Sequence, residues 1–315
     1  MLIIGHYDGH GVASACLFAR KCRQKIGNIF IKYRVTGPSI GEISKLLKYR
    51  WIYRYRKIAF IDIAIDANAP ERFTTVLRLI KQRSNPQILI IDHHRCTSFA
   101  IPYVIREVDI AYRLFGSAVE LSLWCAEPIR AARELAIVAA ICDRDPEVLN
   151  VIKRDRLPFY QECSWGLDIL VRKDIKHAIS ACYNYDLEEL RSYADEFPLP
   201  GEIEKIGDVV VCRKLPYCYS SKAIERACLM HNATYGIGIY RDVRSGKWIV
   251  KTIKVWTKQA PTPRQIVAEI VFPEVERLEY AVENISFQFL KEEKAEKFVQ
   301  RLVKLMNICA GSVSV

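Results

Sequence analysis

The chain has 315 residues, of which 50% are hydrophobic, and a formal net charge of +11 at pH 7, so it is long enough for one large core or two domains. No hydrophobic run reaches the ~18 residues of a membrane span, and residues 2–5 are too short for a signal-peptide core, so we expect a soluble, cytoplasmic protein that does not act at a membrane. The eleven cysteines include no Cys-x-x-Cys pair, and their odd number argues against a secreted disulfide framework.

In the first half of the chain, short aliphatic runs alternate with helical patterns. We expect strands near residues 2–5, 29–35, 58–62 and 88–92, helices near 12–24, 40–50 and 70–83 between them, and further helices near 117–125 and 129–141. Pro70 suits the first turn of its helix, and Asn85-Pro86 suits the end of it. The alternation predicts an α/β fold with a parallel sheet and helices on both faces.

The pattern changes from about residue 187. We expect a first domain at residues 1–186, a linker at 187–205 that contains Pro198 and Pro200, and a smaller mixed α/β domain at 206–315. In the second domain we expect a strand near 209–213, a helix near 222–232, a hairpin of 234–241 with 248–256, a helix near 263–270, a strand near 285–289 and a helix near 291–306.

Four of the six histidines lie in two short clusters, each directly after an aliphatic run. The clusters are His6-Tyr7-Asp8-Gly9-His10-Gly11 and Asp92-His93-His94. Because the carboxyl ends of parallel strands meet at one edge of a sheet, we expect both clusters to converge there with Asp62, at the end of the third strand, and with Asp143. Six or more O and N donors from separate segments are enough for two divalent ions bridged by one carboxylate.

The order of these motifs resembles that of the DHH phosphoesterase superfamily. This superfamily includes RecJ-type nucleases, nano-RNases, cyclic-dinucleotide phosphodiesterases and family II pyrophosphatases. The matching residues are His6-x-Asp8, an aliphatic strand that ends in Asp62, Asp92-His93-His94, and Asp143 after an apolar helix. Gly116-Ser117-Ala118 also looks like the helix start that follows Asp-His-His in the family. The resemblance covers roughly residues 1–185.

The resemblance implies a role for each of these residues. One metal ion would be held by His6, Asp8 and Asp62, and the other by Asp62, His93, Asp143 and His10, so that Asp62 is the catalytic bridge. His94 would face the scissile phosphate, and Asp92 would orient the imidazoles. The resemblance implies two Mn²⁺ ions, with Mg²⁺ or Co²⁺ as possible substitutes. Arg95, next to His94, is a candidate phosphate clamp, with a surface role as the alternative.

The chain departs from the family in two places. His10 stands where the family has an aspartate, and the lost negative charge should weaken binding of the second ion or change the metal preference. Residues 271–278 contain no glycine, although the family's substrate domain has a glycine-rich, histidine-containing loop there. We therefore expect side chains or another surface to hold the substrate.

Positive charge is concentrated between residues 20 and 57, which contain twelve Lys or Arg and one acid. The aromatic residues between these charges suit a polyanion such as nucleic acid, and the alternative is a solvated face of a basic protein. Strand polarity predicts that Arg50, Arg54 and Arg56 lie away from the metals, where they would dock a distal part of a nucleic acid or a protein partner. Only Arg34 is placed to approach the active cleft.

Together these features predict a metal-dependent phosphodiesterase that acts on single-stranded nucleic acid or short oligonucleotides, similar to RecJ-like exonucleases. Two alternatives stay open. One is a phosphoesterase for a small nucleotide or a cyclic dinucleotide. The other is a catalytically weakened or inactive RecJ-like scaffold in a DNA replication or repair complex, to which His10 and the missing glycines point.

Overall fold

The computed structural model describes residues 1–33, 43–215, 220–243, 245–267, 275, 277–280 and 284–311. The chain divides into two compact units, Met1–Glu196 and Phe197–Val315. The boundary lies inside the predicted linker, but the segment between the folded elements is shorter than residues 187–205. Helix α8 (Leu187–Ser192) belongs to the first unit, and strand β6 (Glu202–Ile206) begins the second.

A five-stranded parallel sheet forms the centre of the first unit, with the strand order β2-β1-β3-β4-β5. The strands are β1 (Leu2–His6), β2 (Ile29–Tyr33), β3 (Lys57–Ile61), β4 (Gln87–Asp92) and β5 (Ala111–Leu114). β1, β3 and β4 are neighbours that run in the same direction, so their carboxyl ends lie side by side. The predicted α/β class with a parallel sheet is confirmed, and β5 is a short edge strand that the sequence analysis missed.

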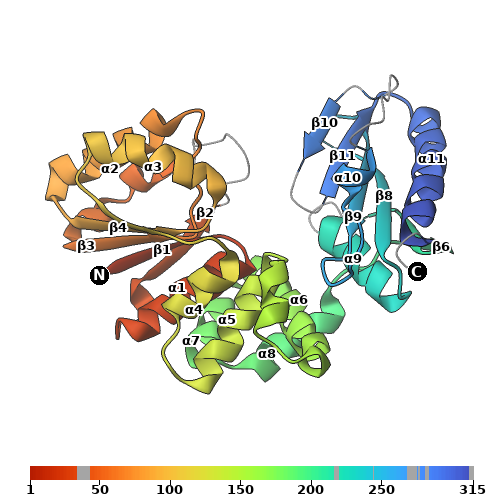
Figure 1. The fold of residues 1–315 in the computed structure, drawn as a ribbon. Coiled ribbons are helices and arrows are strands. Elements are labelled where there is room, and N and C mark those ends of the chain that lie inside the picture. The colour runs from red at the N-terminus through yellow and green to blue at the C-terminus, as the bar shows by residue number, and fades with distance from the viewer. Residues whose placement is uncertain are drawn as a thin grey trace. The chain divides into compact units, whose positions relative to one another are not determined.

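Helices cover both faces of this sheet (Figure 1). On one face, α2 (Pro70–Ser84) and α3 (Arg95–Glu107) bury Phe73, Leu77 and Ile101 against strand residues such as Ile58 and Phe60. On the other face, α1 (Gly9–Lys21) contacts β1, β2 and β3. Its opposite side packs against α4 (Ala118–Cys125), α5 (Arg130–Cys142), α6 (Leu157–Lys173) and α7 (Ile175–Asn184). The first eleven residues of α1 are therefore buried.

The start of α1 is defined by two residues of the first histidine cluster. Asp8 is the N-cap, and its Oδ1 atom accepts a hydrogen bond from the backbone N–H of Gly11 at 2.9 Å. A Cβ atom at Gly11 would lie 2.6 Å from the backbone oxygen of His6, so only glycine lets α1 start this close to β1. The helix consequently begins at Gly9, earlier than the predicted residue 12, and His10 lies in its first turn.

The helix predicted at residues 40–50 is not an α-helix where the structure describes it. Residues 34–42 lie outside the described part of the chain, and two 3-10 helices follow at Ile43–Lys48 and Arg50–Arg54. Trp51, Tyr53 and Tyr55 are half-buried and pack against the core of the first unit. These aromatic side chains hold the segment on the domain.

The second unit contains a six-stranded mixed sheet, with the order β10-β11-β9-β8-β7-β6, in which only β7 and β8 pair in parallel. The remaining strands are β7 (Val209–Arg213), β8 (Tyr235–Arg241), β9 (Trp248–Lys254), β10 (Arg277–Tyr280) and β11 (Asn284–Phe289). The helices are α9 (Ser220–Met230), α10 (Pro263–Val267) and α11 (Glu292–Gly311). The predicted mixed α/β architecture is confirmed. Residues 271–274 and 276 of the divergent loop lie outside the described residues.

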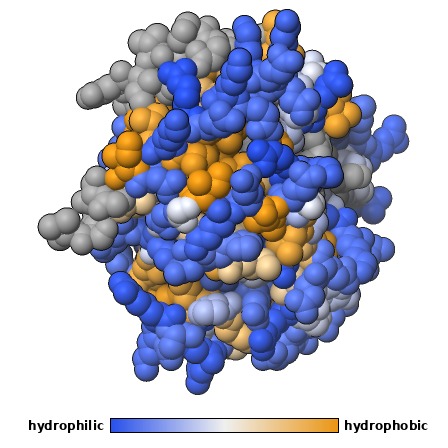
Figure 2. Space-filling view, turned by 90° about the vertical axis from the view of Figure 1, so that its right-hand side faces the viewer, coloured by the Kyte–Doolittle hydropathy of each residue, from blue (hydrophilic) through white to orange (hydrophobic). Residues whose placement is uncertain are grey.

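The described helices include none that is both long and apolar enough to cross a bilayer. Figure 2 shows one face of the molecule, on which hydrophilic residues prevail and hydrophobic residues form smaller groups between them.

Candidate metal centre

Asp62 lies at the carboxyl end of β3 and is the residue around which the site is built. Its backbone N–H donates to the carbonyl oxygen of Ile91 in β4 at 2.8 Å, which ties the two strand ends together. Its φ angle is +58°, in the left-handed region that aspartate tolerates better than most residues. The side chain is only 1% exposed, so its carboxylate must find its partners inside the protein.

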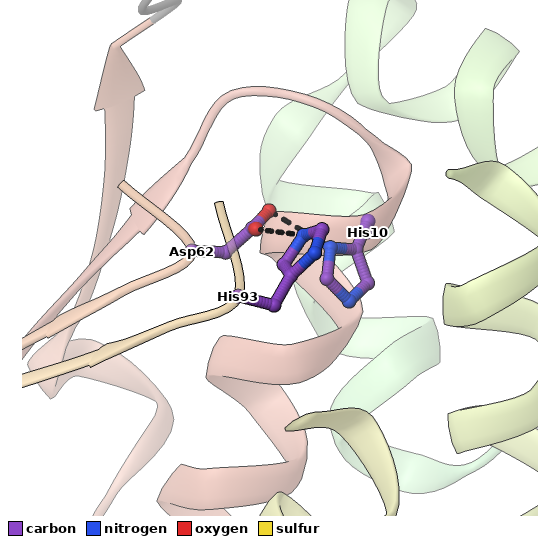
Figure 3. Close-up of side chains that lie close together, drawn as sticks. All are labelled: His10, Asp62 and His93. Atoms are coloured by element: carbon purple, nitrogen blue, oxygen red, sulfur yellow. Dashed lines mark ion pairs between the residues drawn. The ribbon is translucent and has the colours of Figure 1, made fainter. Parts of the chain in front are cut away.

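Imidazoles from two other segments contact this carboxylate (Figure 3). Nδ1 of His10, in the first turn of α1, lies 3.0 Å from Asp62 Oδ2, and Nε2 of His93, after β4, lies 3.1 Å from Asp62 Oδ1. His6 and His94 are slightly farther away, with their Nδ1 atoms 3.9 and 3.8 Å from the nearest Asp62 oxygen. All four histidines of the two sequence clusters therefore surround one buried carboxylate.

Two further carboxylates complete the cluster. Asp8 Oδ2 lies 2.7 Å from Nδ1 of His6, while the other oxygen of Asp8 caps α1. Asp143, the residue that ends α5, lies 3.0 Å from Nε2 of His93 and 3.6 Å from Nδ1 of His10. The structure thus brings all six predicted metal ligands together, namely His6, Asp8, His10, Asp62, His93 and Asp143.

The donor atoms fit divalent cations. Three sets of side chains offer ligand atoms within 4.8 Å of one another, and Asp62 belongs to each set. The sets are His10, Asp62 and His93; His6, Asp8 and Asp62; and Asp62, Asp92 and His94. Nδ1 of His10, Oδ1 of Asp62 and Nε2 of His93 are buried and make no hydrogen bond, although the contacts are short. Buried polar atoms normally have partners, and a cation between them would provide one.

The carboxylates control the charge of the imidazoles. Burial opposes protonation of His93, but Asp143 and Asp62 outweigh it and raise its pKa to about 11. For His6, burial is likewise outweighed, chiefly by Asp8, and the pKa rises to about 9. Burial opposes ionisation of Asp143, yet His10 and His93 lower its pKa to about 2. Without a cation, protons on the imidazoles therefore balance the carboxylates.

Asp92 and His94 form a separate pair at the edge of the cluster. Asp92 ends β4 and is fully buried, and its Oδ1 lies 2.7 Å from Nδ1 of His94. The His94 side chain is 33% exposed, so one side of its ring is open to solvent. Burial is outweighed by Asp92 and Asp62, and the pKa of His94 rises to about 9. This short contact engages Oδ1 of Asp92, whereas Oδ2 is buried and makes no hydrogen bond.

Arg95 and Arg34 are the two arginines predicted to bind a substrate phosphate beside the candidate metal ligands. Arg95 begins α3 directly after His94, but its side chain is exposed and its guanidinium lies over the ring of Phe99, 5.7 Å from the centroid. Arg34 lies outside the described residues. The described conformation thus shows no phosphate clamp, and that role for either arginine stays a prediction.

Arg50, Arg54 and Arg56 are exposed and directly precede β3, at the end of the sheet opposite to Asp62. This location agrees with the one expected from strand polarity. The neighbouring aromatic residues Trp51, Tyr53 and Tyr55, by contrast, pack against the core. That the segment binds a polyanion stays a prediction, and the exposed arginine charges are the feature that suits it.

Sequence analysis missed two residues of the site. Oγ of Ser122, in α4, lies 3.0 Å from Nε2 of His10, and Oγ of Ser14 lies 3.1 Å from Oγ of Ser122. All three side chains are fully buried. Ser14 follows His10 by four residues, one helical turn, and Ser122 is a single hydroxyl in the otherwise apolar run 121–125. Those two patterns are the features of the sequence from which the two serines could have been found.

No protein-family model matches the sequence, and no curated protein matches it. Similar solved structures include a Mn²⁺ complex of RecJ from Thermus thermophilus, at TM-score 0.44 and 13% identity over 96% of this chain and 51% of that one. This chain spans about half the length of that RecJ. Another is the pGpG-specific phosphodiesterase PggH from Vibrio cholerae, at TM-score 0.46 and 12% identity over 98% of this chain and 99% of that one. A third is CDC45 from Entamoeba histolytica, at TM-score 0.42 and 7% identity over 97% of this chain and 95% of that one.

All three TM-scores are below 0.5, so the functional argument rests on the site itself. The chain resembles the DHH phosphoesterase superfamily in the order of its motifs along the sequence. RecJ-like structures are among the solved structures to which it is similar.

Proposed function

We propose that the protein is a divalent-metal-dependent phosphodiesterase, similar to RecJ-like exonucleases, that hydrolyses single-stranded nucleic acid or short oligonucleotides in the cytoplasm. The observation that carries the proposal is the shared position of Asp62. Asp62 belongs to one donor set with His10 and His93 and to another with His6 and Asp8, and its Oδ2 atom lies 3.0 Å from Nδ1 of His10 and 3.9 Å from Nδ1 of His6. A carboxylate shared between two sets is the arrangement needed to bridge two cations.

In this proposal, His6, Asp8 and Asp62 hold one cation, and Asp62, His10, His93 and Asp143 hold the other. Mixed imidazole and carboxylate donors suit Mn²⁺, and Co²⁺ or Mg²⁺ are possible substitutes. When bound, such a pair supplies the Lewis acidity that activates water and neutralises charge on a phosphoryl group.

His94 supplies the contact with the substrate. Asp92 fixes its Nδ1 atom at 2.7 Å, and the raised pKa keeps the ring protonated at neutral pH. The remaining Nε2–H is then available to donate to a phosphate oxygen, with the strength of a charge-assisted hydrogen bond. The buried Asp92 thereby positions His94 and keeps its charge.

The test is hydrolysis of labelled single-stranded DNA, single-stranded RNA and a linear dinucleotide during a Mn²⁺ titration. We expect cleavage by the wild type and loss of cleavage in Asp62→Ala. Asp66→Ala is the matched control, because Asp66 lies four residues away and accepts a hydrogen bond only in its own turn, from Asn68 N–H at 2.9 Å. Cleavage retained in Asp62→Ala would contradict the proposal. Cleavage of the dinucleotide alone would identify a small-nucleotide phosphoesterase instead.

One observation favours the scaffold alternative. His10 replaces an anionic ligand with a neutral one, and the cluster balances its own charges through contacts such as His93 with Asp143 at 3.0 Å. A protein with this site could act as a structural partner in replication or repair. Absence of cleavage with Mn²⁺, Mg²⁺ and Co²⁺, together with no heat of ion binding in calorimetry, would establish that alternative.

A further inference from the structure

The ring of His10 is held on both of its nitrogen atoms. Nδ1 faces Asp62 Oδ2 at 3.0 Å, and Nε2 faces the hydroxyl of Ser122 at 3.0 Å. The Ser122 hydroxyl in turn contacts that of Ser14 at 3.1 Å. The ring of His93 meets the ring of His10 edge-on, at a centroid distance of 5.0 Å and an interplanar angle of 83°. These contacts place Nε2 against a hydroxyl, while Nδ1 is buried beside Asp62 without a hydrogen bond of its own.

The contacts also select a tautomer when the ring is neutral. A neutral imidazole has one N–H and one lone pair, and only the lone pair can bind a cation. If Nε2 carries the hydrogen, it donates to Ser122 Oγ, and Ser122 can donate onward to Ser14 Oγ. Nδ1 then directs its lone pair toward Asp62 and Asp143, whose oxygens lie 3.0 and 3.6 Å away.

We propose that Ser122, supported by Ser14, is a positioning residue that fixes His10 as an Nδ1 ligand of the second cation. This inference rests on the proposed metal site. A carboxylate at position 10 has no tautomers and two equivalent oxygens, so it needs no such partner. The imidazole does need one, and partners of this kind commonly affect metal affinity by 10- to 100-fold. Ser122 and His10 therefore form one functional pair.

The first test is Mn²⁺ affinity by calorimetry in the wild type, Ser122→Ala and Ser122→Thr. We expect the second Mn²⁺ to bind about 10- to 100-fold more weakly to Ser122→Ala, and Thr, which keeps the hydroxyl, to restore most of the affinity. Ser164→Ala is the matched control, since Ser164 is also a buried helical serine, with its hydroxyl bonded to the Gln161 carbonyl at 2.8 Å. Equal affinity in Ser122→Ala and the control would overturn the inference.

The second test observes the His10 ring directly. In protein labelled with ¹⁵N-histidine and loaded with Zn²⁺ as a diamagnetic probe, we expect His10 to be protonated only at Nε2. His10→Asn identifies its signal by removing it. Ser122→Ala should give a mixture of tautomers or a shifted, broadened signal, whereas a serine that only fills space would leave the spectrum unchanged and overturn the inference.

A double-mutant cycle separates this inference from the proposed function. In the His10→Asp background, Ser122→Ala should leave Mn²⁺ affinity within about 2-fold, because no imidazole remains to be oriented. An effect as large as that in the wild type would show that Ser122 acts on something other than His10. If the wild type binds no Mn²⁺, the proposed function fails and this inference fails with it. Two bound ions with no effect of Ser122→Ala would overturn the inference alone.

Discussion

At the scale of single residues, we expect substitutions of Asp62 and of Asp143 to affect metal content differently. Asp62 belongs to the set with His10 and His93 and to the set with His6 and Asp8, whereas among the described residues Asp143 forms ion pairs with His93 and His10. We therefore expect Asp62→Asn to lose both cations and Asp143→Asn to lose only the second. Metal content after dialysis against Mn²⁺, measured by mass spectrometry, checks this difference. Equal losses in the two variants would contradict a bridging role for Asp62.

The raised histidine pKa values predict how Mn²⁺ affinity depends on pH. Without a cation, His6 and His93 are protonated at neutral pH, because their pKa values are about 9 and about 11. A cation binds neutral imidazole, so binding must release these protons, and rising pH should favour it by up to about 10-fold per pH unit for each proton.

Calorimetry between pH 6 and 8.5, in two buffers with different ionisation enthalpies, measures both the affinity and the protons released. We expect the affinity to rise throughout this range, because it lies below both pKa values. An affinity that does not change with pH would mean that the imidazoles are neutral before the cation binds.

At the scale of elements, the junction of β1 and α1 contains a side chain that both stabilises a helix and belongs to the candidate metal site. One oxygen of Asp8 caps α1 through Gly11 N–H at 2.9 Å, and the other lies 2.7 Å from His6. The same side chain thus begins the helix that carries His10 and contributes to the first cation site. Replacing Asp8 with asparagine separates its effect on stability from its effect on metal affinity, because asparagine is also a good N-cap but a poor ligand.

We expect Asp8→Ala to destabilise the metal-free protein by about 1 kcal/mol more than Asp8→Asn does, because both lose the pairing with His6 and only asparagine keeps the cap. Both variants should bind the first Mn²⁺ more weakly. Urea unfolding of metal-free protein and calorimetry measure the two effects. If Asp8→Asn destabilised the fold as much as Asp8→Ala, the pairing with His6 would be the dominant contribution to stability and the cap a minor one.

At the scale of the whole molecule, the polarity of the parallel sheet separates two groups of charged side chains in the first unit. The acidic and imidazole residues lie where β1, β3 and β4 end, and Arg50, Arg54 and Arg56 lie where β3 begins. These arginines are too far along the strand direction to contact a phosphate bound at Asp62. We infer that they dock a more distant part of a nucleic acid, or a protein partner.

Charge reversal at Arg50, Arg54 and Arg56 distinguishes these partners. If they contact single-stranded nucleic acid, the reversed variant should bind it more weakly, and the slope of log affinity against log salt should fall by about 2. Reversal of Arg133, Lys153 and Arg154, which are exposed elsewhere in the first unit, is the matched control. Unchanged affinity and slope, measured by fluorescence anisotropy, would contradict a nucleic-acid contact and leave a protein partner or a solvated basic face as the alternatives.

The sequence by itself determined the fold class, the order of most elements and which six side chains converge at the candidate site. It could do so because alternating short aliphatic runs and helices indicate a parallel sheet, and because side chains after such strands meet at one edge. The same reasoning missed β5, since its four residues form a short and mostly exposed edge strand with little hydrophobic pattern. It also did not predict that Trp51, Tyr53 and Tyr55, which lie between the basic residues, pack partly against the core.

Only the tertiary structure decided how the ligands are oriented. The contact between Ser122 and His10 joins residues that are 112 positions apart, and no local pattern in either helix specifies it. The left-handed backbone of Asp62 and its bond to Ile91 arise from the pairing of β3 with β4. Local sequence fixes which residues follow a strand or begin a helix, whereas the direction of a buried side chain depends on neighbours that only packing brings into contact.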